Sequence, residues 1–329
     1  MTGAQEVSTD PGPVVVVDVG ARWGVAEAWR SLAPDLRVFG FDPDTEECAR
    51  LNDAARAAGD ETTTYVPVAL GPRRETVDLY VTRHPACTSI YRPLVELIET
   101  IPVLADIELD KTVPVDLEPL DSWCEANGVG HVDVLKSDTQ GADLGVLQGA
   151  VRALSTCVLV ECEVEFNPLY EGQPLFSHVD EFLRSQGFVL WRLDNLTHYT
   201  DGEVHPRLDV GVTVMNEYRS SLGRFGGGQL YWADGYWVRA ELCGPVAQRD
   251  PMLAQRAARI ARAAGLPDLA ARILPECGPE LVTEAQDARR ARRRARRAAK
   301  RAARKAALPA PARKPAVSRL RRAAAALRR

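Results

Sequence analysis

Residues 14–24 are VVVVDVGARWG, and this stretch decides the fold. Four consecutive valines predict a strand that is buried on both faces, as the strands of a parallel sheet are. Asp18 places a carboxylate at the end of this strand, while Gly20 and Gly24 allow a tight turn and a close approach of the backbone to a ligand. A helix is expected over residues 24–32. The stretch therefore predicts a ligand crevice at the carboxyl end of a parallel strand.

A second segment, residues 132–149, repeats this arrangement. Its first part, VDVLKSD, predicts another buried strand that ends in Asp138, and residues 143–149 predict the helix that follows. Further strands are expected at residues 36–41, 62–70, 76–82, 112–117, 157–164, 188–193 and 209–215, and further helices at residues 44–58, 94–104, 120–127 and 175–186. This alternation of strands and helices predicts an α/β protein with a parallel sheet and crossover helices.

The first turn has the pattern D-x-G-x-x-x-G. It lacks the dinucleotide fingerprint G-x-G-x-x-G, because Arg22 and Val25 stand where that fingerprint has glycine, which argues against NAD or FAD. The strand at residues 36–41 ends in Asp42, an acid that can accept hydrogen bonds from ribose hydroxyls. Acids after both strands resemble the S-adenosylmethionine (SAM) site of Rossmann-like methyltransferases. A doubly wound domain whose turns merely happen to be acidic is the alternative.

The composition fits one large domain or two small ones, since 46% of the 329 residues are hydrophobic. No apolar run reaches about 18 residues, so no membrane span is expected. Residues 1–13 are polar and lack a signal-peptide apolar region, which predicts a flexible N-terminus and a cytoplasmic location. The seven cysteines form no C-x-x-C pair, so neither a zinc ribbon nor a disulfide framework is indicated.

The charge is distributed unevenly along the chain. Residues 288–329 hold 18 of the 41 Lys and Arg residues and no acid, which leaves 23 basic against 45 acidic residues elsewhere. Two parts of a chain that differ this much in charge usually behave as separate units. The expected organisation is a methyltransferase domain over residues 14–250, a short helical extension over 251–282 and a basic tail over 283–329. This tail is expected to be disordered or a free helix.

Longer motifs resemble the FkbM family of SAM-dependent methyltransferases. The most specific is DVLKSDTQGAD (133–143) followed by VLQG (146–149). Residues 18–21, residues 161–172 and the group Gly226, Gly228, Gln229, Leu230 and Asp234 also resemble it. There are three departures. Arg22 stands where the family often has Asn, Asp42 where it often has Glu, and Gln140 where many members have Glu.

The resemblance implies a Rossmann-like class I methyltransferase fold. This is a seven-stranded, mostly parallel sheet with a final antiparallel strand and helices on both faces. It also implies SAM as cofactor and methyl transfer to a hydroxyl, often on sugars, glycans or secondary metabolites. Cofactor contacts are then expected from Asp18, Gly20, Ala21, Gly24, Asp42, Ala69, Ser89 and Asp138.

An alcohol acceptor must lose a proton, either to a general base or through a bound metal. The candidates are Asp138, Glu163 and His178; no metal ligands are assigned, and a divalent metal is left open. Asp138 ends a strand beside the SAM strand, but a solvated acid or a helix cap is its structural alternative. His178 is one of five histidines, and a half-buried helix residue is the commoner role.

Three acids, Glu161, Glu163 and Glu165, share one face of a strand because side chains alternate with a period of two. If these three carboxylates were buried without partners, their charges would destabilise the fold. A cation, a metal or a polyhydroxyl substrate would relieve them, and so would pairing with Arg192 or Lys136. Either arrangement is compatible with the sequence.

Two other interpretations compete with an O-methyltransferase. Residues 167–170 (NPLY) are similar to the N-P-P-Y box of amino-methylating DNA enzymes, but the second proline is missing and the box follows the wrong strand. The other is a SAM-binding or anchoring protein without turnover, recruited to an anionic membrane or nucleic acid by its basic tail. Aromatic residues in 218–237 suit a sugar ring, or the packing of a C-terminal subdomain.

Overall fold

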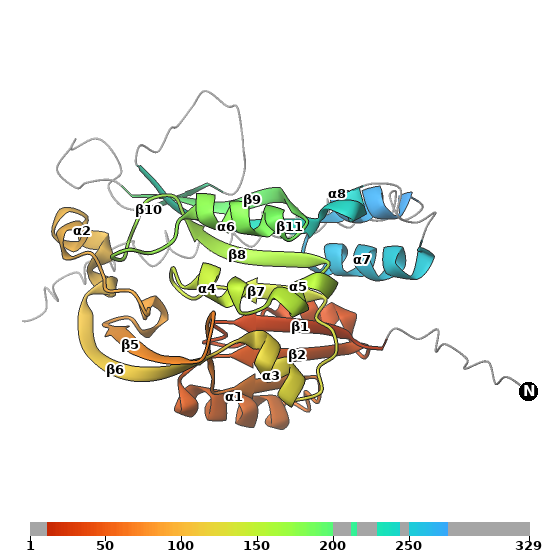
Figure 1. The fold of residues 1–329 in the computed structure, drawn as a ribbon, viewed down its shortest axis with the longest axis horizontal. Coiled ribbons are helices and arrows are strands. Elements are labelled where there is room, and N and C mark those ends of the chain that lie inside the picture. Colours follow the sequence, from red (N-terminus) through yellow and green to blue (C-terminus); the bar gives the residue numbers. More distant parts are fainter. Residues whose placement is uncertain (1–11, 200–211, 216–228, 244–249, 276–329) are drawn as a thin grey trace, which may run out of the picture. The chain divides into compact units, whose positions relative to one another are not determined.

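The computed structural model describes residues 12–199, 212–215, 229–243 and 250–275, and it has the expected α/β architecture (Figure 1). A large sheet has the strand order β10-β9-β11-β8-β7-β1-β2-β3. Its strands are β1 (Val14–Val19), β2 (Leu36–Phe41), β3 (Thr63–Val66), β7 (Val134–Ser137), β8 (Leu159–Glu165), β9 (Phe188–Tyr199), β10 (Val212–Met215) and β11 (Gln229–Arg239).

The sheet is mostly parallel. β1 runs parallel to β2 and β7, β2 to β3, and β7 to β8. β11 is antiparallel to both β8 and β9, so β9 runs in the same direction as the parallel strands. Seven strands therefore form the predicted sheet with its one antiparallel strand, and the short β10 extends the edge beyond β9 as an eighth strand.

Helices cover both faces of this sheet (Figure 1). On one face, Val15 and Val17 of β1 belong to a core cluster with residues of α3 to α6. Gly40 of β2 points to the other face, where a Cβ atom would meet the ring of Tyr65, and Tyr65 packs against α1. The helices are α1 (Thr45–Ala57), α2 (Val95–Thr100), α3 (Leu120–Ala126), α4 (Asp143–Gln148), α5 (Val151–Thr156), α6 (Phe176–Ser185), α7 (Pro251–Ala263) and α8 (Pro267–Ile273).

A second, three-stranded sheet lies beside the first. It consists of β4 (Ala69–Leu70), β5 (Glu75–Thr82) and β6 (Leu109–Glu118), in the order β4-β6-β5. The single strand expected over residues 62–70 is therefore wrong, since its two halves, β3 and β4, belong to different sheets. Pro67 lies between them, and a proline cannot donate a ladder hydrogen bond.

Short 3₁₀ helices replace two of the expected α-helical segments. Residues 24–32 contain η1 (Glu27–Leu32), and the predicted helix at 94–104 is α2 followed by η3 (Pro102–Ile107). Two further 3₁₀ turns are η2 (Pro85–Cys87) and η4 (Ala240–Cys243). By contrast, α1 begins where expected, because the Asp44 side chain accepts hydrogen bonds from the N–H groups of Glu46 and Glu47.

The helices of the predicted extension, α7 and α8, pack on the body of the domain. Arg256 of α7 makes a two-pronged ion pair with Asp133, with N–O distances of 2.6 Å, and also donates to the carbonyls of Gly12 and Pro13. This pairing links α7 to the amino ends of the central strands. The predicted basic tail over 283–329 lies outside the described residues, and so do residues 1–11 of the segment 1–13 that was expected to be flexible.

Two of the four aromatic residues of β11, Tyr231 and Trp237, have structural roles, while Trp232 and Tyr236 are half-buried. Trp237 and Tyr231 are buried, and the Trp237 indole donates to Asp180 of α6 at 2.9 Å. Tyr218 and Phe225 lie outside the described residues. Within the described part of the chain, no helix has the length and apolar character that a membrane crossing requires.

Candidate cofactor and proton-transfer site

A cavity of about 160 Å³ lies at the carboxyl ends of β1, β2 and β7. This is where ligands bind in open parallel sheets. Five of the predicted cofactor residues line it: Gly20, Asp42, Ala69, Ser89 and Asp138. Its apolar wall comes from Val19, Phe41, Val68, Leu79, Ile90 and Leu117. The sequence therefore located the cavity correctly, although three predicted contacts do not line it.

Asp18, Ala21 and Gly24 are those three residues. Ala21 is 2% exposed and packs with Tyr65 and α1 instead. Gly24 has a φ of +101° and donates its N–H to the Ala21 carbonyl at 3.0 Å. Both residues therefore shape the turn after β1 and stay behind the wall of the cavity.

The buried Asp18 carboxylate accepts a hydrogen bond from Lys136 Nζ at 3.0 Å. Burial raises the pKa of Asp18, and the Lys136 charge offsets part of that rise. Burial alone would lower the pKa of Lys136, but the charges of Asp18 and Asp138 raise it. The two side chains form a buried ion pair beneath the cavity.

Gly20 permits a close backbone contact at the cavity floor. Its φ is +80°, and a Cβ atom there would collide with the carbonyl oxygen of Asp138. The ends of β1 and β7 can approach this closely only because position 20 carries no side chain.

Asp42 presents a buried carboxylate to the cavity. Its Oδ1 accepts from the Asp44 N–H at 2.8 Å and lies 3.7 Å from Arg22 Nη1. Burial raises its pKa, while the Asp44 N–H and the Arg22 charge work against that rise. Arg22 is held in turn by Asp44, at 2.7 Å. Trp23, which the sequence did not single out, also lines the cavity and is 63% exposed.

The hydroxyl of Ser89 is already used within the protein. It donates to the Gln140 carbonyl at 2.7 Å and accepts from the Tyr91 N–H at 3.0 Å. Ser89 thereby fastens the loop after β5 to the turn after β7. Its predicted contact with the cofactor remains a prediction.

Two of the predicted catalytic residues, Asp138 and Glu163, are brought together by a third. Gln140 Nε2 donates to Asp138 Oδ1 at 3.1 Å and to Glu163 Oε1 at 2.7 Å. Burial raises the pKa of Glu163 well above its usual value, and the charge of Asp138 adds to that rise. Asp138 and Gln140 line the cavity, whereas Glu163 is not among its lining residues. Two carboxyl groups that share a donor can accept and release a proton in acid–base chemistry.

His178 is not brought to this group. It is exposed on the first turn of α6, where its Nδ1 accepts the Leu175 N–H at 3.0 Å. It completes a capping interaction at the N-terminus of that helix and does not line the cavity. Its position on α6 agrees with the alternative to a general base, a residue with a structural role in a helix.

The other two glutamates of β8 have separate environments. Burial raises the pKa of Glu161 to about 7, although the nearby Lys136 charge lowers it. Glu165 is 2% exposed, and burial raises its pKa well above the usual value. Arg192 pairs with Asp194 instead, at 2.7 Å. Among the described residues, no group of three His, Cys, Asp or Glu side chains is arranged to hold a metal ion.

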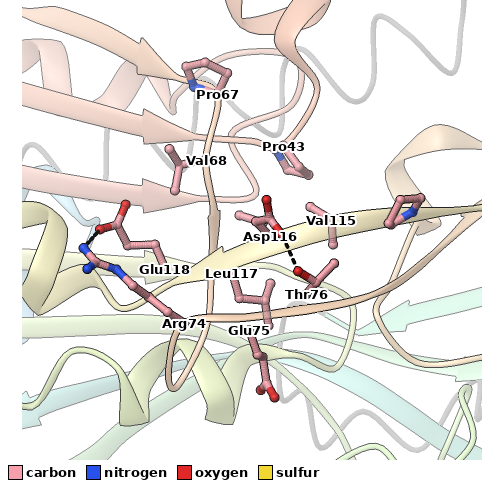
Figure 2. A pocket seen from close by; sticks show the side chains of 12 residues that line it. Pro43, Pro67, Val68, Arg74, Glu75, Thr76, Val115, Asp116, Leu117 and Glu118 are labelled. Atoms are coloured by element: carbon pink, nitrogen blue, oxygen red, sulfur yellow. Dashed lines mark hydrogen bonds and ion pairs between the residues drawn. The ribbon is translucent and has the colours of Figure 1, made fainter.

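A second, more open cavity of about 680 Å³ adjoins the first between β5, β6 and the loops after β2 and β3 (Figure 2). Its polar side chains bind one another: Arg74 donates to Glu118 and Thr76 donates to Asp116, each at 2.5 Å. The residues that line both cavities are Pro43, Val68, Ala69 and Leu117. The two cavities thus share one wall.

Comparison with known proteins gives a family match and one curated relative. Residues 18–190, more than half of the chain, match the sequence model of the Methyltransferase FkbM domain. The chain is 27% identical over 201 residues to "2-O-methyltransferase NoeI" of Sinorhizobium fredii (strain NBRC 101917 / NGR234). That alignment covers 55% of this chain and 80% of the relative.

Solved structures of methyltransferases are also similar. An FkbM methyltransferase from Methylobacillus flagellatus KT is 18% identical with a TM-score of 0.27, over 46% of this chain and 33% of that chain. The magnesium protoporphyrin IX methyltransferase (ChlM) of Synechocystis PCC 6803 with bound SAM is 10% identical with a TM-score of 0.32, over 69% and 71% of the two chains.

Proposed function

Because the chain belongs to the FkbM methyltransferase family, we propose that it transfers a methyl group from SAM to a hydroxyl of a sugar, glycan or related polyol metabolite. The observation that carries this proposal is the cavity at the carboxyl ends of β1, β2 and β7, with Asp42 and Asp138 in its wall. The 2-O-methyltransferase relative supports oxygen as the methylated atom.

The residues of this cavity fit SAM chemically. Asp42 offers a buried carboxylate to ribose hydroxyls, and the Val68–Ala69 backbone with Ile90 offers an apolar slot for adenine. Asp138 offers a carboxylate to the positive sulfonium. Lys136 neutralises Asp18 beneath the cavity, so Asp18 supports this wall and is not free to bind the amino-acid end of SAM. When bound, SAM supplies an electrophilic methyl group and leaves as a neutral sulfide.

The acceptor hydroxyl must give up its proton, and Asp138 and Glu163 are the groups proposed to take it. They lie at the ends of neighbouring parallel strands and share one hydrogen-bond donor. Orientation of the hydroxyl against this pair supplies much of the rate in a displacement at carbon. General-base assistance typically contributes 10²–10⁴-fold. No step requires a metal ligand, and His178 has no part in this proposal.

A thermal-shift titration of the full chain tests the cofactor. SAM, S-adenosylhomocysteine and NADH are compared, since a ligand at about 100 times its Kd stabilises by about 2.7 kcal/mol. Stabilisation by the first two alone is expected, with a change in tryptophan fluorescence because Trp23 lines the cavity. A response to NADH alone, or to none of the three, would overturn the proposal.

Asp138→Asn and Glu163→Gln test the chemistry once an acceptor has been found among sugars and polyols. Turnover is expected to fall by roughly 10²–10⁴-fold in each variant. SAM affinity is largely kept in Glu163→Gln, whereas Asp138→Asn should also weaken SAM binding because it removes the carboxylate offered to the sulfonium. His178→Gln serves as the control and should leave turnover unchanged. Full turnover in both carboxyl variants would make the assignment of the base wrong. SAM binding without turnover on any acceptor would favour a binding or anchoring protein instead.

A further inference from the structure

Gln140 is the point at which the cavity wall and the carboxyl pair meet. Its Nε2 supplies hydrogen bonds to both Asp138 and Glu163, while its Oε1 lies 3.1 Å from the Tyr170 hydroxyl. Tyr170 is fully buried, and its hydroxyl also lies 2.9 Å from the Cys87 carbonyl. A carboxylate only accepts hydrogen bonds, so the amide nitrogen facing these two acids supplies the donor that an ionised carboxyl group needs.

The backbone holds this side chain in place as well. Gln140 has a φ of +55°, a left-handed conformation that is uncommon for residues other than glycine. Its carbonyl accepts the Ser89 hydroxyl at 2.7 Å, and the next residue, Gly141, has a φ of +90°. Such conformations persist where the surroundings over-determine them, and they gather at functional sites. The turn after β7 therefore fixes the position of the Gln140 side-chain amide.

We propose that Gln140 is a positioning residue, whose locked amide in the cavity wall holds the carboxyl groups of Asp138 and Glu163 as a pair. This inference rests on the proposed function. In the reaction, the oxygen–methyl bond forms as the sulfur–methyl bond breaks and its electron pair leaves with the sulfide. The acceptor O–H bond breaks, and its proton passes to the ionised carboxylate of the pair. That carboxyl group later releases the proton to solvent.

The charge of residue 140 matters because the surroundings are already acidic. A neutral amide donates two N–H groups to two acids, whereas a glutamate would add a third carboxylate and remove both donors. Like charges at this distance raise the pKa of at least one member. The one cation beside the pair in the described structure is Lys136, whose Nζ lies 3.9 Å from Asp138 Oδ2. The other titratable groups that interact with Glu163 are Glu165, Asp234, Asp143, Tyr170, Tyr199, Cys87 and Cys162.

Two variants separate the side chain from the backbone. Gln140→Gly removes the amide but keeps the positive φ and the carbonyl that Ser89 binds, so the turn is retained without strain. Gln140→Glu keeps the shape and changes the charge. Gln186→Glu, at the end of α6, is the matched control for adding one negative charge. Thermal unfolding of each variant reports whether the fold is kept.

The decisive measurement is the pH profile of kcat, together with the KM for SAM. For Gln140→Gly we expect kcat to fall by roughly 100-fold with little change in KM, since misplacing a catalytic group by about 1 Å costs about this much. For Gln140→Glu we expect the acidic limb of the profile to move to higher pH, because one of three carboxyl groups keeps its proton longer. A merely structural role would leave the pH profile unchanged.

The outcomes show separately whether the positioning role fails or the proposed function fails. If the wild-type protein turns over and both variants keep its kcat and pH profile, the positioning role is wrong and the proposed function stands. If the wild-type protein neither binds SAM nor transfers methyl groups, the proposed function fails, and the positioning role fails with it. If Gln140→Glu does not fold, the kcat of Gln140→Gly decides.

Discussion

Lys136 Nζ lies 3.0 Å from Asp18 Oδ1, and the two residues stand directly opposite each other on β7 and β1. They are separated by 118 positions in the chain. Both side chains are largely buried, at 18% and 2% exposure. The acid of the first motif therefore forms an ion pair with the lysine of the second motif. This pair joins the two motifs across neighbouring strands of the sheet.

Removal of the lysine should destabilise the fold strongly. Lys136→Met leaves Asp18 buried without a counter-charge, and breaking a buried pair costs about 3–5 kcal/mol. The double variant Asp18→Asn with Lys136→Met removes both charges and should recover most of that loss. Urea unfolding at constant pH measures the free energy of each. A single variant as stable as the wild type would contradict the pairing.

Glu161 should make stability depend on pH. Folding raises its pKa from 4.5 to about 7, chiefly by burial. Its contribution is therefore complete below pH 4.5 and is lost as the pH rises through 7. Glu161→Gln should remove this loss and raise the free energy of unfolding at pH 8 by up to about 3 kcal/mol, since one pKa unit is about 1.4 kcal/mol.

The control for this measurement is Glu125→Gln, because the Glu125 side chain is 71% exposed. It should leave the slope of stability against pH as in the wild type. If the free energy of unfolding of Glu161→Gln depends on pH from 5 to 8 as that of the wild type does, the pKa of Glu161 is not raised by folding.

Gly20 and Gly59 form a matched pair of glycines for testing the close contact at the cavity floor. Both have positive φ, +80° and +69°, but only at Gly20 would a Cβ atom meet another atom, the Asp138 carbonyl. Gly59→Ala should cost only the backbone term, about 1 kcal/mol. Gly20→Ala should cost several times more, or prevent SAM binding. Equal melting temperatures for the two variants would show that the contact is unimportant.

The basic tail stays a prediction of the sequence, and deletion tests it. Residues 288–329 contain 18 basic residues and no acid. Without them, binding to anionic vesicles or nucleic acid should disappear, while SAM affinity should stay unchanged. Adsorption is measured at low and high salt, because binding by charge weakens as salt rises. Adsorption that survives the deletion would assign it to another surface.

Much of this protein was predictable from local pattern. The four valines of β1 and the valine-rich run of β7 specified buried parallel strands, and Asp44 specified the start of α1. The same patterns indicated a cavity at the strand ends, because alternating strands and helices predict a parallel sheet whose carboxyl ends share one edge. Five of the eight predicted cofactor residues line that cavity.

Other assignments depended on contacts that no spacing reveals. Asp18 was expected in the cofactor site, but its partner lies 118 positions away on a neighbouring strand. His178 was a candidate base, but a helix begins beside it and uses its ring nitrogen. In the sequence Gln140 stands out only as a departure from the family pattern, but its φ of +55° and its hydrogen bonds to Asp138 and Glu163 place it at the centre of the proposed site.

The sequence by itself thus determined most of the strands and helices, the parallel character of the central sheet and the strand ends at which a ligand crevice was expected. It could do so because the spacing of apolar residues, capping residues and turn residues are local properties of the chain. Only the tertiary structure decided which carboxylates are paired with a cation, as Asp18 is with Lys136, and which share the Gln140 amide. That choice depends on side chains brought within about 3 Å of each other from distant strands, where hydrogen bonds and charge pairs act.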